Sequence, residues 1–223
     1  MKKIAILTLG LTLFANAHFL TFIPSSDNIS DKKNTKINFD ISFIHPFEQT
    51  GMTMEEPKLF VNSLDKTLPL IQTTKFEHKA WESSYDIKTP GVYKFFVQPQ
   101  PYFEPAEEKF ISHVPKVIIS SFGLEDSWDE PIGLKYEIIP MSKPFALYAG
   151  NLFQGKVLHD GKPAINVEVE VELYNEFGLK APSDAHITQV VKTDANGVFS
   201  FVMNHKGWWG FAALIEEGAI KHK

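Results

Sequence analysis

The chain has 223 residues and no cysteine, and 22 lysine and arginine residues against 27 aspartate and glutamate residues give it a formal net charge of −5. This charge, without any basic cluster, argues against binding to nucleic acid or to an anionic membrane surface. Without cysteine there are no disulfides, so a packed core must stabilise the fold. A metal site would have to use histidine, methionine, carboxylate or backbone ligands.

The first 17 residues have the pattern of a secretory signal peptide. Two lysines precede an apolar run over residues 4–14, and the sequence Ala-Asn-Ala then supplies a small-x-small cleavage pattern. The run is too short to span a bilayer of about 30 Å, so we expect no retained membrane anchor. We expect residues 1–17 to be removed after export, and the mature chain to begin at His18.

The segments that follow the leader predict strands rather than helices. Apolar and polar residues alternate over 38–47 and in part of 58–64, two short strands flank a Pro-Gly turn in 85–99, and 116–123 is a short apolar run. No segment keeps a helical period for three turns with caps at both ends. Short strands broken by turn residues are typical of a β-sandwich, and we expect the first such domain over 18–144.

A second sandwich is predicted over 145–223. Residues 150–175 read as a strand, an Asp-Gly turn and a strictly alternating strand, and 193–214 continue with an Asn-Gly hairpin turn. This order resembles the small transthyretin-like, or carboxypeptidase-regulatory-like, sandwiches. We expect this sandwich to lack its last strand, because no further apolar run follows residue 214. The predicted fold class is therefore all-β, with two β-sandwiches of immunoglobulin-like and transthyretin-like type after a cleaved signal peptide.

Four segments carry a more specific resemblance. Residues 45–60, 98–117, 123–140 and 147–163 resemble, in order, a family of periplasmic nickel or cobalt uptake components that are associated with energy-coupling-factor or other ABC-type importers. The resemblance implies a periplasmic location and a divalent metal ion as cargo. It also implies a membrane permease as partner.

An N-terminal histidine is the first candidate metal ligand. His18 would offer its α-amine and a ring nitrogen to the same ion, and an α-amine with a pKa near 8 gives up its proton at little cost at neutral pH. Imidazole and amine suit the tetragonal sites of Ni(II) and Cu(II). The alternative is that His18 only begins the first strand.

His45 and Met54 are candidates from one segment. His45 precedes a proline, which places it where a strand gives way to a loop. Met54 belongs to a Met-x-Met pattern among Thr, Gly and Glu residues, which favours a loop. The alternative is that these methionines fill a gap in the core, as methionine commonly does.

His113 and Glu104 are the remaining candidates. His113 follows an acidic, aromatic-rich loop in which Tyr102, Phe103 and Glu104 would form one wall of a site. The alternative is a strand histidine that is hydrogen-bonded to a neighbouring loop. If the metal site exists, we expect His18, His45 and His113 at one end of the first sandwich, with their imidazole nitrogens within about 4–5 Å of one another.

Three functions remain open from the sequence. The first is a metal carrier that binds Ni(II), in preference to Co(II), and delivers it to a membrane permease. The second is a copper enzyme in which the N-terminal histidine and a second histidine form a three-nitrogen brace around Cu(II). The third is a metal-free interaction module. The sequence contains no nucleophile elbow, phosphate-binding glycine loop or zinc-protease motif, so we assign no catalytic residue and expect no enzyme.

Overall fold

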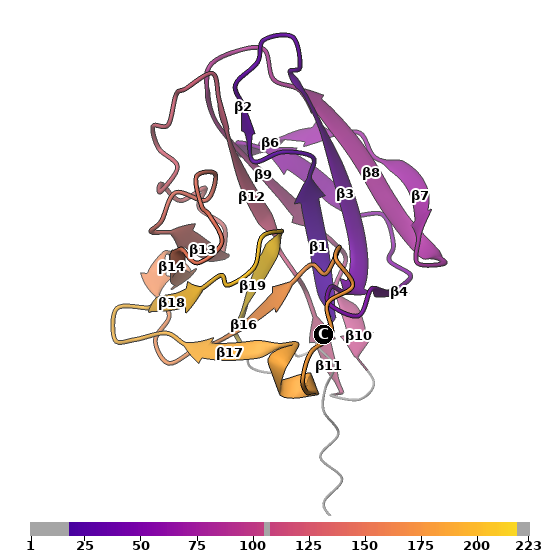
Figure 1. The fold of residues 1–223 in the computed structure, drawn as a ribbon, viewed down its shortest axis with the longest axis vertical. Coiled ribbons are helices and arrows are strands. Elements are labelled where there is room, and N and C mark those ends of the chain that lie inside the picture. Colours follow the sequence, from indigo (N-terminus) through magenta and orange to yellow (C-terminus); the bar gives the residue numbers. More distant parts are fainter. Residues whose placement is uncertain (1–17, 105–107, 218–223) are drawn as a thin grey trace, which may run out of the picture.

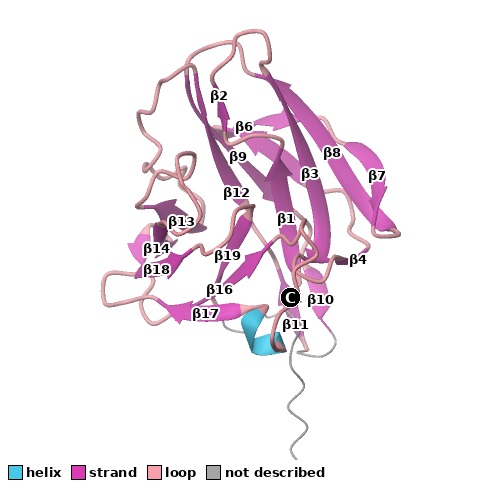
Figure 2. Ribbon diagram, viewed as in Figure 1, coloured by secondary structure: helices cyan, strands magenta, loops and turns pink. Residues whose placement is uncertain are grey.

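The computed structural model describes residues 18–104 and 108–217 (Figure 1). Nearly all of the regular structure in this part of the chain is β-strand, and its single helical segment is the short 3₁₀ turn η1 (Asp184–His186), shown in cyan in Figure 2. The predicted all-β class is therefore confirmed. The predicted signal peptide, residues 1–17, lies outside the described residues. Among the residues that are described, no helix is both long and apolar enough to cross a membrane.

The N-terminal half forms two facing sheets. The first sheet has the order β1-β3-β8-β7 with β4 added to β3, and its strands are β1 (Phe19–Pro24), β3 (Lys36–His45), β4 (Thr50–Met52), β7 (Ile71–Lys75) and β8 (His78–Asp86). The second sheet has the order β2-β12-β9-β5-β6, and its strands are β2 (Asn28–Ile29), β5 (Lys58–Val61), β6 (Ser63–Leu68), β9 (Gly91–Gln98) and β12 (Lys116–Ser121).

The core between these sheets follows from a period of two. In β3, Ile37, Phe39, Ile41 and Phe43 alternate with more polar residues and are all buried in one cluster with apolar residues of β9. The ring of Phe39 packs against Phe95 of β9, with centroids 4.7 Å apart. This alternation predicts that the next odd-numbered residue of β3, which is His45, also lies on the inner side of its sheet.

A separate hairpin lies beside one end of these sheets. It consists of β10 (Tyr102–Glu104) and β11 (Lys109–Ile111), which pair with each other. Tyr102 packs against the core between the N-terminal sheets. Phe103 and Phe110 instead keep 50% and 58% of their surface exposed and pack against each other, with ring centroids 5.3 Å apart. The hairpin therefore presents Tyr102 to the core and an aromatic pair to solvent.

The C-terminal half forms two further sheets around a second core. One contains β13 (Tyr136–Pro140), β14 (Leu152–His159), β15 (Lys162–Pro163) and β18 (Val198–Val202), with β14 pairing all the others. The other has the order β17-β16-β19, formed by β17 (Gln189–Lys192), β16 (Glu168–Leu173) and β19 (Trp209–Leu214). Their shared core includes Val157, Val169, Val171 and Phe199. Gly155 is required there, because a Cβ atom at this position would lie 2.6 Å from the ring of Phe199.

The boundary between the two halves lies earlier than the sequence predicts. Strand β13 falls inside the predicted first domain, 18–144, yet it pairs with β14 of the C-terminal sheets. The change of sheet therefore falls between β12 and β13. A buried ion pair spans this point: Lys116 Nζ on β12 lies 2.5 Å from Glu137 Oε1 on β13, and Glu137 also accepts backbone N–H groups from Ile132, Gly133 and Leu134.

Candidate metal centre

His18 and His45 lie opposite each other at the end of the first sheet. Strands β1 and β3 pair antiparallel from Phe19 opposite Ile44 to Pro24 opposite Phe39, so the next position places His18 opposite His45. Their ring centroids are 3.9 Å apart, with an angle of 42° between the planes. Both side chains follow the inward alternation of their strands, since Leu20 and Phe43 belong to the core. The sequence prediction that these two histidines share a location is therefore met by the geometry.

Phe43 connects this pair to His113. The ring of Phe43 stacks on His18 at 5.5 Å and meets the ring of His113 edge-on at 5.4 Å. Tyr102 completes the group, with its ring 4.9 Å from that of Phe43. All three candidate histidines thus gather at the same end of the N-terminal sheets. Sequence reasoning missed Phe43, although the alternation of β3 places it on the same face as His45, two residues before it.

His113 has an unsatisfied ring nitrogen. Its Nε2 atom is buried and has no hydrogen-bond partner among the described residues. Burial, and to a smaller extent the nearby His18, lowers the pKa of His113 to about 4. The ring is therefore neutral at physiological pH, and a buried polar atom without a partner is costly unless a ligand occupies it. A neutral imidazole nitrogen is the form in which histidine binds a metal ion.

The electrostatics of His18 place Glu104 nearby. Burial, and then the charge of His45, lowers the pKa of His18, while the carboxylate of Glu104 opposes this shift. A positive charge on the neighbouring ring therefore makes His18 harder to protonate. Glu104, the last residue of β10, is thus close enough to act on His18, whereas Phe103, which was expected on the same wall, is exposed on the other face of the hairpin.

Met54 lies in the connection between β4 and β5, as its neighbours predicted, but its side chain is buried in the core. Its side chain is 8% exposed and lies in the core cluster between the N-terminal sheets, and its carbonyl oxygen accepts the Trp81 Nε1–H at 3.4 Å. The role as core filler therefore accounts for Met54 without a metal ion. Met52, the other methionine of the pattern, pairs directly opposite Phe43 and packs against the same core.

The predicted ligands are close together but are not arranged around one point. No three histidine, aspartate or glutamate side chains of the described ranges 18–104 and 108–217 form a group that could hold a metal ion as they stand. His18 and His45 form a close pair, whereas His113 lies across Phe43 from them. The predicted α-amine ligand depends on cleavage after residue 17, which lies outside the described residues. A complete shell therefore requires that amine, or a rotation of His113 or Glu104 towards the pair.

Three of the other described histidines have polar side chains beside their rings. His159 Nε2 lies 3.4 Å from both Asp160 Oδ2 and Glu217 Oε1. His186 and His205 form hydrogen bonds of 2.9 Å with Ser183 and Asn204, respectively.

The fold and the site define an all-β chain with a cluster of three histidines at the end of a pair of facing sheets. Residues 15–217 match the family described as a domain of unknown function, DUF4198, and the chain belongs to this family. No curated protein matches the chain. The family description names no function, so the nickel and cobalt role remains a prediction.

Comparison with solved structures returns bacterial proteins at low similarity. The D0-D1 domain of intimin has 15% identity and a TM-score of 0.27, and the match covers 91% of this chain and 94% of that one. The adhesin InvE of Yersinia pseudotuberculosis has 11% identity and a TM-score of 0.25, with 81% and 49% covered. The TIE protein of Bacillus anthracis has 8% identity and a TM-score of 0.18, with 87% and 52% covered. These values are too low to inform function.

Proposed function

We propose that this chain is an exported, non-enzymatic metal-binding protein that captures Ni(II), in preference to Co(II), and delivers it to a membrane importer. In this proposal the signal peptide is cleaved before His18, and two sandwich domains form the periplasmic protein. His18, His45 and His113 supply imidazole nitrogens, the new N-terminus adds its amine, and Glu104 is the carboxylate beside them.

The observation that carries the proposal is the apposition of His18 and His45 beside a third, buried histidine with a free nitrogen. Two imidazole rings 3.9 Å apart repel each other when both are protonated, and a shared metal ion removes that repulsion. The buried Nε2 atom of His113 is a further nitrogen that can bind a metal ion, and it has no hydrogen-bond partner among the described residues. The rings of His18 and His113 pack against Phe43, and the ring of His45 packs against that of His18.

A second candidate function rests on the same pair of rings. His18 with its amine and His45 would supply the three nitrogens of a copper-binding histidine brace, and the chain would then be a secreted copper enzyme. The two proposals differ in the remaining coordination positions. A carrier fills them with His113 or Glu104, whereas an oxidase leaves a position open for its reaction.

Calorimetry on the exported chain tests the proposal. We expect one Ni(II) ion per chain with a dissociation constant of roughly 1 μM or less. His18→Ala and His45→Ala should each weaken binding by at least about tenfold, as loss of a ligand requires. His205→Ala, an exposed histidine away from the site, is the matched control and should leave the affinity unchanged.

Titrations with Co(II), Cu(II) and Zn(II) belong to the same experiment. Cu(II) can bind more tightly than Ni(II) on intrinsic affinity alone, so the order of affinities does not identify the metal that the protein carries. Full Cu(II) affinity in His113→Ala, together with turnover of an oxidisable substrate, would favour the enzyme. Binding of none of the four ions would leave the metal-free interaction module. Intact-mass measurement of the exported chain should show a start at His18.

A further inference from the structure

The loop that follows His45 fixes the end of strand β3. Residues 46–49 connect β3 to β4, and the backbone N–H of Gln49 donates to the carbonyl oxygen of His45 at 2.8 Å. Thr50, the first residue of β4, pairs with His45. The position of His45 therefore depends on how this short connection is held.

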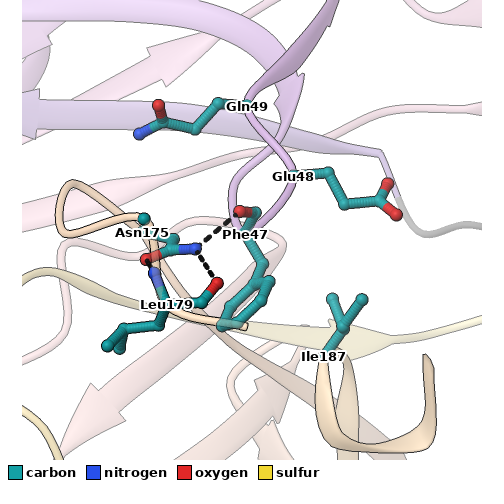
Figure 3. Close-up of a pocket in the computed structure, with 7 residues that line it drawn as sticks. Phe47, Glu48, Gln49, Asn175, Leu179 and Ile187 are labelled. Carbon is teal, nitrogen blue, oxygen red and sulfur yellow. Dashed lines mark hydrogen bonds between the residues drawn. The ribbon is translucent and has the colours of Figure 1, made fainter. Parts of the chain in front are cut away.

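Asn175, which follows β16 in the C-terminal half, forms hydrogen bonds to the loop 46–49. Its backbone N–H donates to Pro46 O at 3.1 Å, and its Nδ2 donates to Phe47 O at 3.1 Å. The side chain is itself fixed, because Nδ2 also donates to Leu179 O at 2.9 Å and Oδ1 accepts the Leu179 N–H at 2.8 Å (Figure 3). Both carbonyl groups next to His45 in the loop thus have Asn175 as their donor.

Glu172 binds the N–H group of the Pro46–Phe47 peptide, whose carbonyl group Asn175 binds. Its Oε1 accepts the Phe47 N–H at 2.8 Å, and its Oε2 accepts the hydroxyl of Thr188 at 2.8 Å. Glu172 is 1% exposed, so this carboxyl group is buried at the contact between the two halves. Burying a carboxyl group is costly, and a stable core would more readily use an apolar residue here. The backbone N–H and C=O of Phe47 are therefore both bound by side chains of the C-terminal half.

The strand next to Glu172 in the C-terminal sheet also lies beside Phe19, the residue after His18. Glu172 on β16 pairs with Gly210 on β19. A Cβ atom at Gly210 would lie 3.5 Å from the ring of Phe19, an ordinary contact distance, so β19 packs beside Phe19 of β1. One cross-strand pair thus contacts a residue adjacent to His18 and the loop adjacent to His45.

We propose that Glu172 and Asn175 are positioning residues of the metal centre, which set the spacing of His18 and His45 through the loop 46–49 and strand β1. The proposal rests on the proposed metal-binding function and extends it. In this arrangement the C-terminal sheet β17-β16-β19 is part of the metal site although it contributes no ligand. Outer residues that orient a ligand commonly change metal affinity by about 10–100-fold when they are replaced.

The test compares three variants of the full exported chain. Glu172→Leu removes the acceptor of the Phe47 N–H at similar size, and we expect Ni(II) affinity to fall by about tenfold. Glu172→Gln keeps an acceptor oxygen and should restore affinity to within about twofold of the native value. Glu168→Leu makes the same chemical change on the exposed start of β16, away from the loop, and should leave affinity unchanged.

Two further measurements separate positioning from a loss of fold. Thermal unfolding shows whether Glu172→Leu remains folded at the temperature of the titration, and the visible spectrum of bound Co(II) reports ligand geometry. A changed Co(II) spectrum in folded Glu172→Leu, reversed in Glu172→Gln, supports the proposal. If Glu172→Leu does not fold, Asn175→Ser takes its place with the same expected loss; it removes the side-chain hydrogen bonds to Phe47 and Leu179 and keeps the backbone bond to Pro46.

Different results would contradict the proposed metal-binding function and the proposed positioning role. If the native chain binds no metal ion, the proposed function fails and the positioning role fails with it. If the native chain binds Ni(II) and a folded Glu172→Leu variant binds it with the native affinity and Co(II) spectrum, only the positioning role is overturned. Equal losses in Glu172→Leu and Glu168→Leu would also overturn it, because the effect would then not pass through the loop.

Discussion

The ring of Tyr102 lies parallel to the ring of His113, with 8° between their planes and 6.0 Å between their centroids. Tyr102 begins β10 and His113 precedes β12, so the hairpin β10–β11 covers this histidine with an aromatic side chain. Together with the edge of Phe43, this cover keeps His113 out of water, and burial is the main cause of its low pKa. The hairpin is therefore a determinant of the protonation state of the site.

Removing this cover should raise the pKa of His113. In Tyr102→Ala, water reaches the ring, and we expect the pKa to rise from about 4 towards the ordinary value of 6.5. NMR titration of the ring protons measures it. Phe103→Ala, which removes an exposed ring from the other face of β10, is the matched control. A His113 pKa that stays near 4 in Tyr102→Ala would show that Tyr102 does not control its burial.

Stability should depend on His113 in acid. The folded-state pKa of about 4 is below the unfolded value of 6.5, so the unfolded chain binds the proton first as pH falls. The contribution to stability is complete above about pH 6.5 and is lost progressively as pH falls to about 4, by up to about 3 kcal/mol. Urea unfolding of native and His113→Phe chains at pH 7 and pH 4 measures this. Equal losses in both chains would contradict it.

Metal binding should weaken in two stages as pH falls. The α-amine of His18, with an ordinary pKa near 8, takes up a proton below that value, which should cost about tenfold in Ni(II) affinity for each pH unit. The pKa values of His18 and His113 are both lowered by burial, so protons compete for their ring nitrogens only at lower pH than in a free histidine, and the loss should become steeper nearer pH 5. Calorimetry from pH 8 to pH 5 tests it, and an affinity that stays the same between pH 8 and pH 6 would contradict the amine ligand.

Glu172 should have the opposite pH dependence. Burial raises its pKa to about 7, and the charges of Glu170 and Glu48 act in the same direction, while the bonds from Phe47 and Thr188 oppose it. Its contribution to stability is complete below the unfolded pKa of about 4.5 and is lost as pH rises through about 7. Glu172→Gln should therefore gain up to about 3 kcal/mol relative to the native chain between pH 4 and pH 8. Chemical unfolding at both values provides the measurement.

Gly155→Ala should destabilise the C-terminal half. The added methyl group would meet the ring of Phe199 at 2.6 Å and Ile138 at 3.0 Å, which forces the core to shift at a cost of about 1–3 kcal/mol. Gly210→Ala meets only atoms at 3.5 Å or more and is the matched control. The difference between their free energies of unfolding tests the packing of β14 against β18.

The sequence predicted strands and inward faces well because both depend on local alternation. Phe39, Ile41, Phe43 and His45 can be assigned to one face from their spacing alone. The sequence predicted that His18 and His45 lie at the same end of the sandwich, but it could not predict that they are directly opposite each other, because the register of β1 against β3 depends on how the chain between them turns. Strand β13 was predicted in the wrong half for a related reason. The sequence of these five residues, Tyr136–Pro140, does not indicate which sheet the strand joins.

The contact of Glu172 and Asn175 with residues 46–47 could not be predicted from the sequence either. Residues that are 125 positions apart form it, and Glu172 reads locally as an outward-facing charge in an alternating strand. Only burial by the other half of the chain reveals its role. Met54 lies in a loop, as its polar neighbours predicted, but nothing in the local sequence indicates that its side chain packs into the core.

Because β1 pairs with β3 residue by residue, the geometry of the site depends on where a residue is inserted and not on the total length of the chain. Adding one residue between His18 and Phe19 would turn the histidine to the opposite face of the sheet, although every ligand would remain in the sequence. Adding residues to the turn over 30–35, between β2 and β3, would leave His18 opposite His45, because the six pairs from Phe19 to Pro24 hold β1 in place. Residues can therefore be added to that turn without moving His18, whereas the spacing between His18 and Phe19 has to stay fixed.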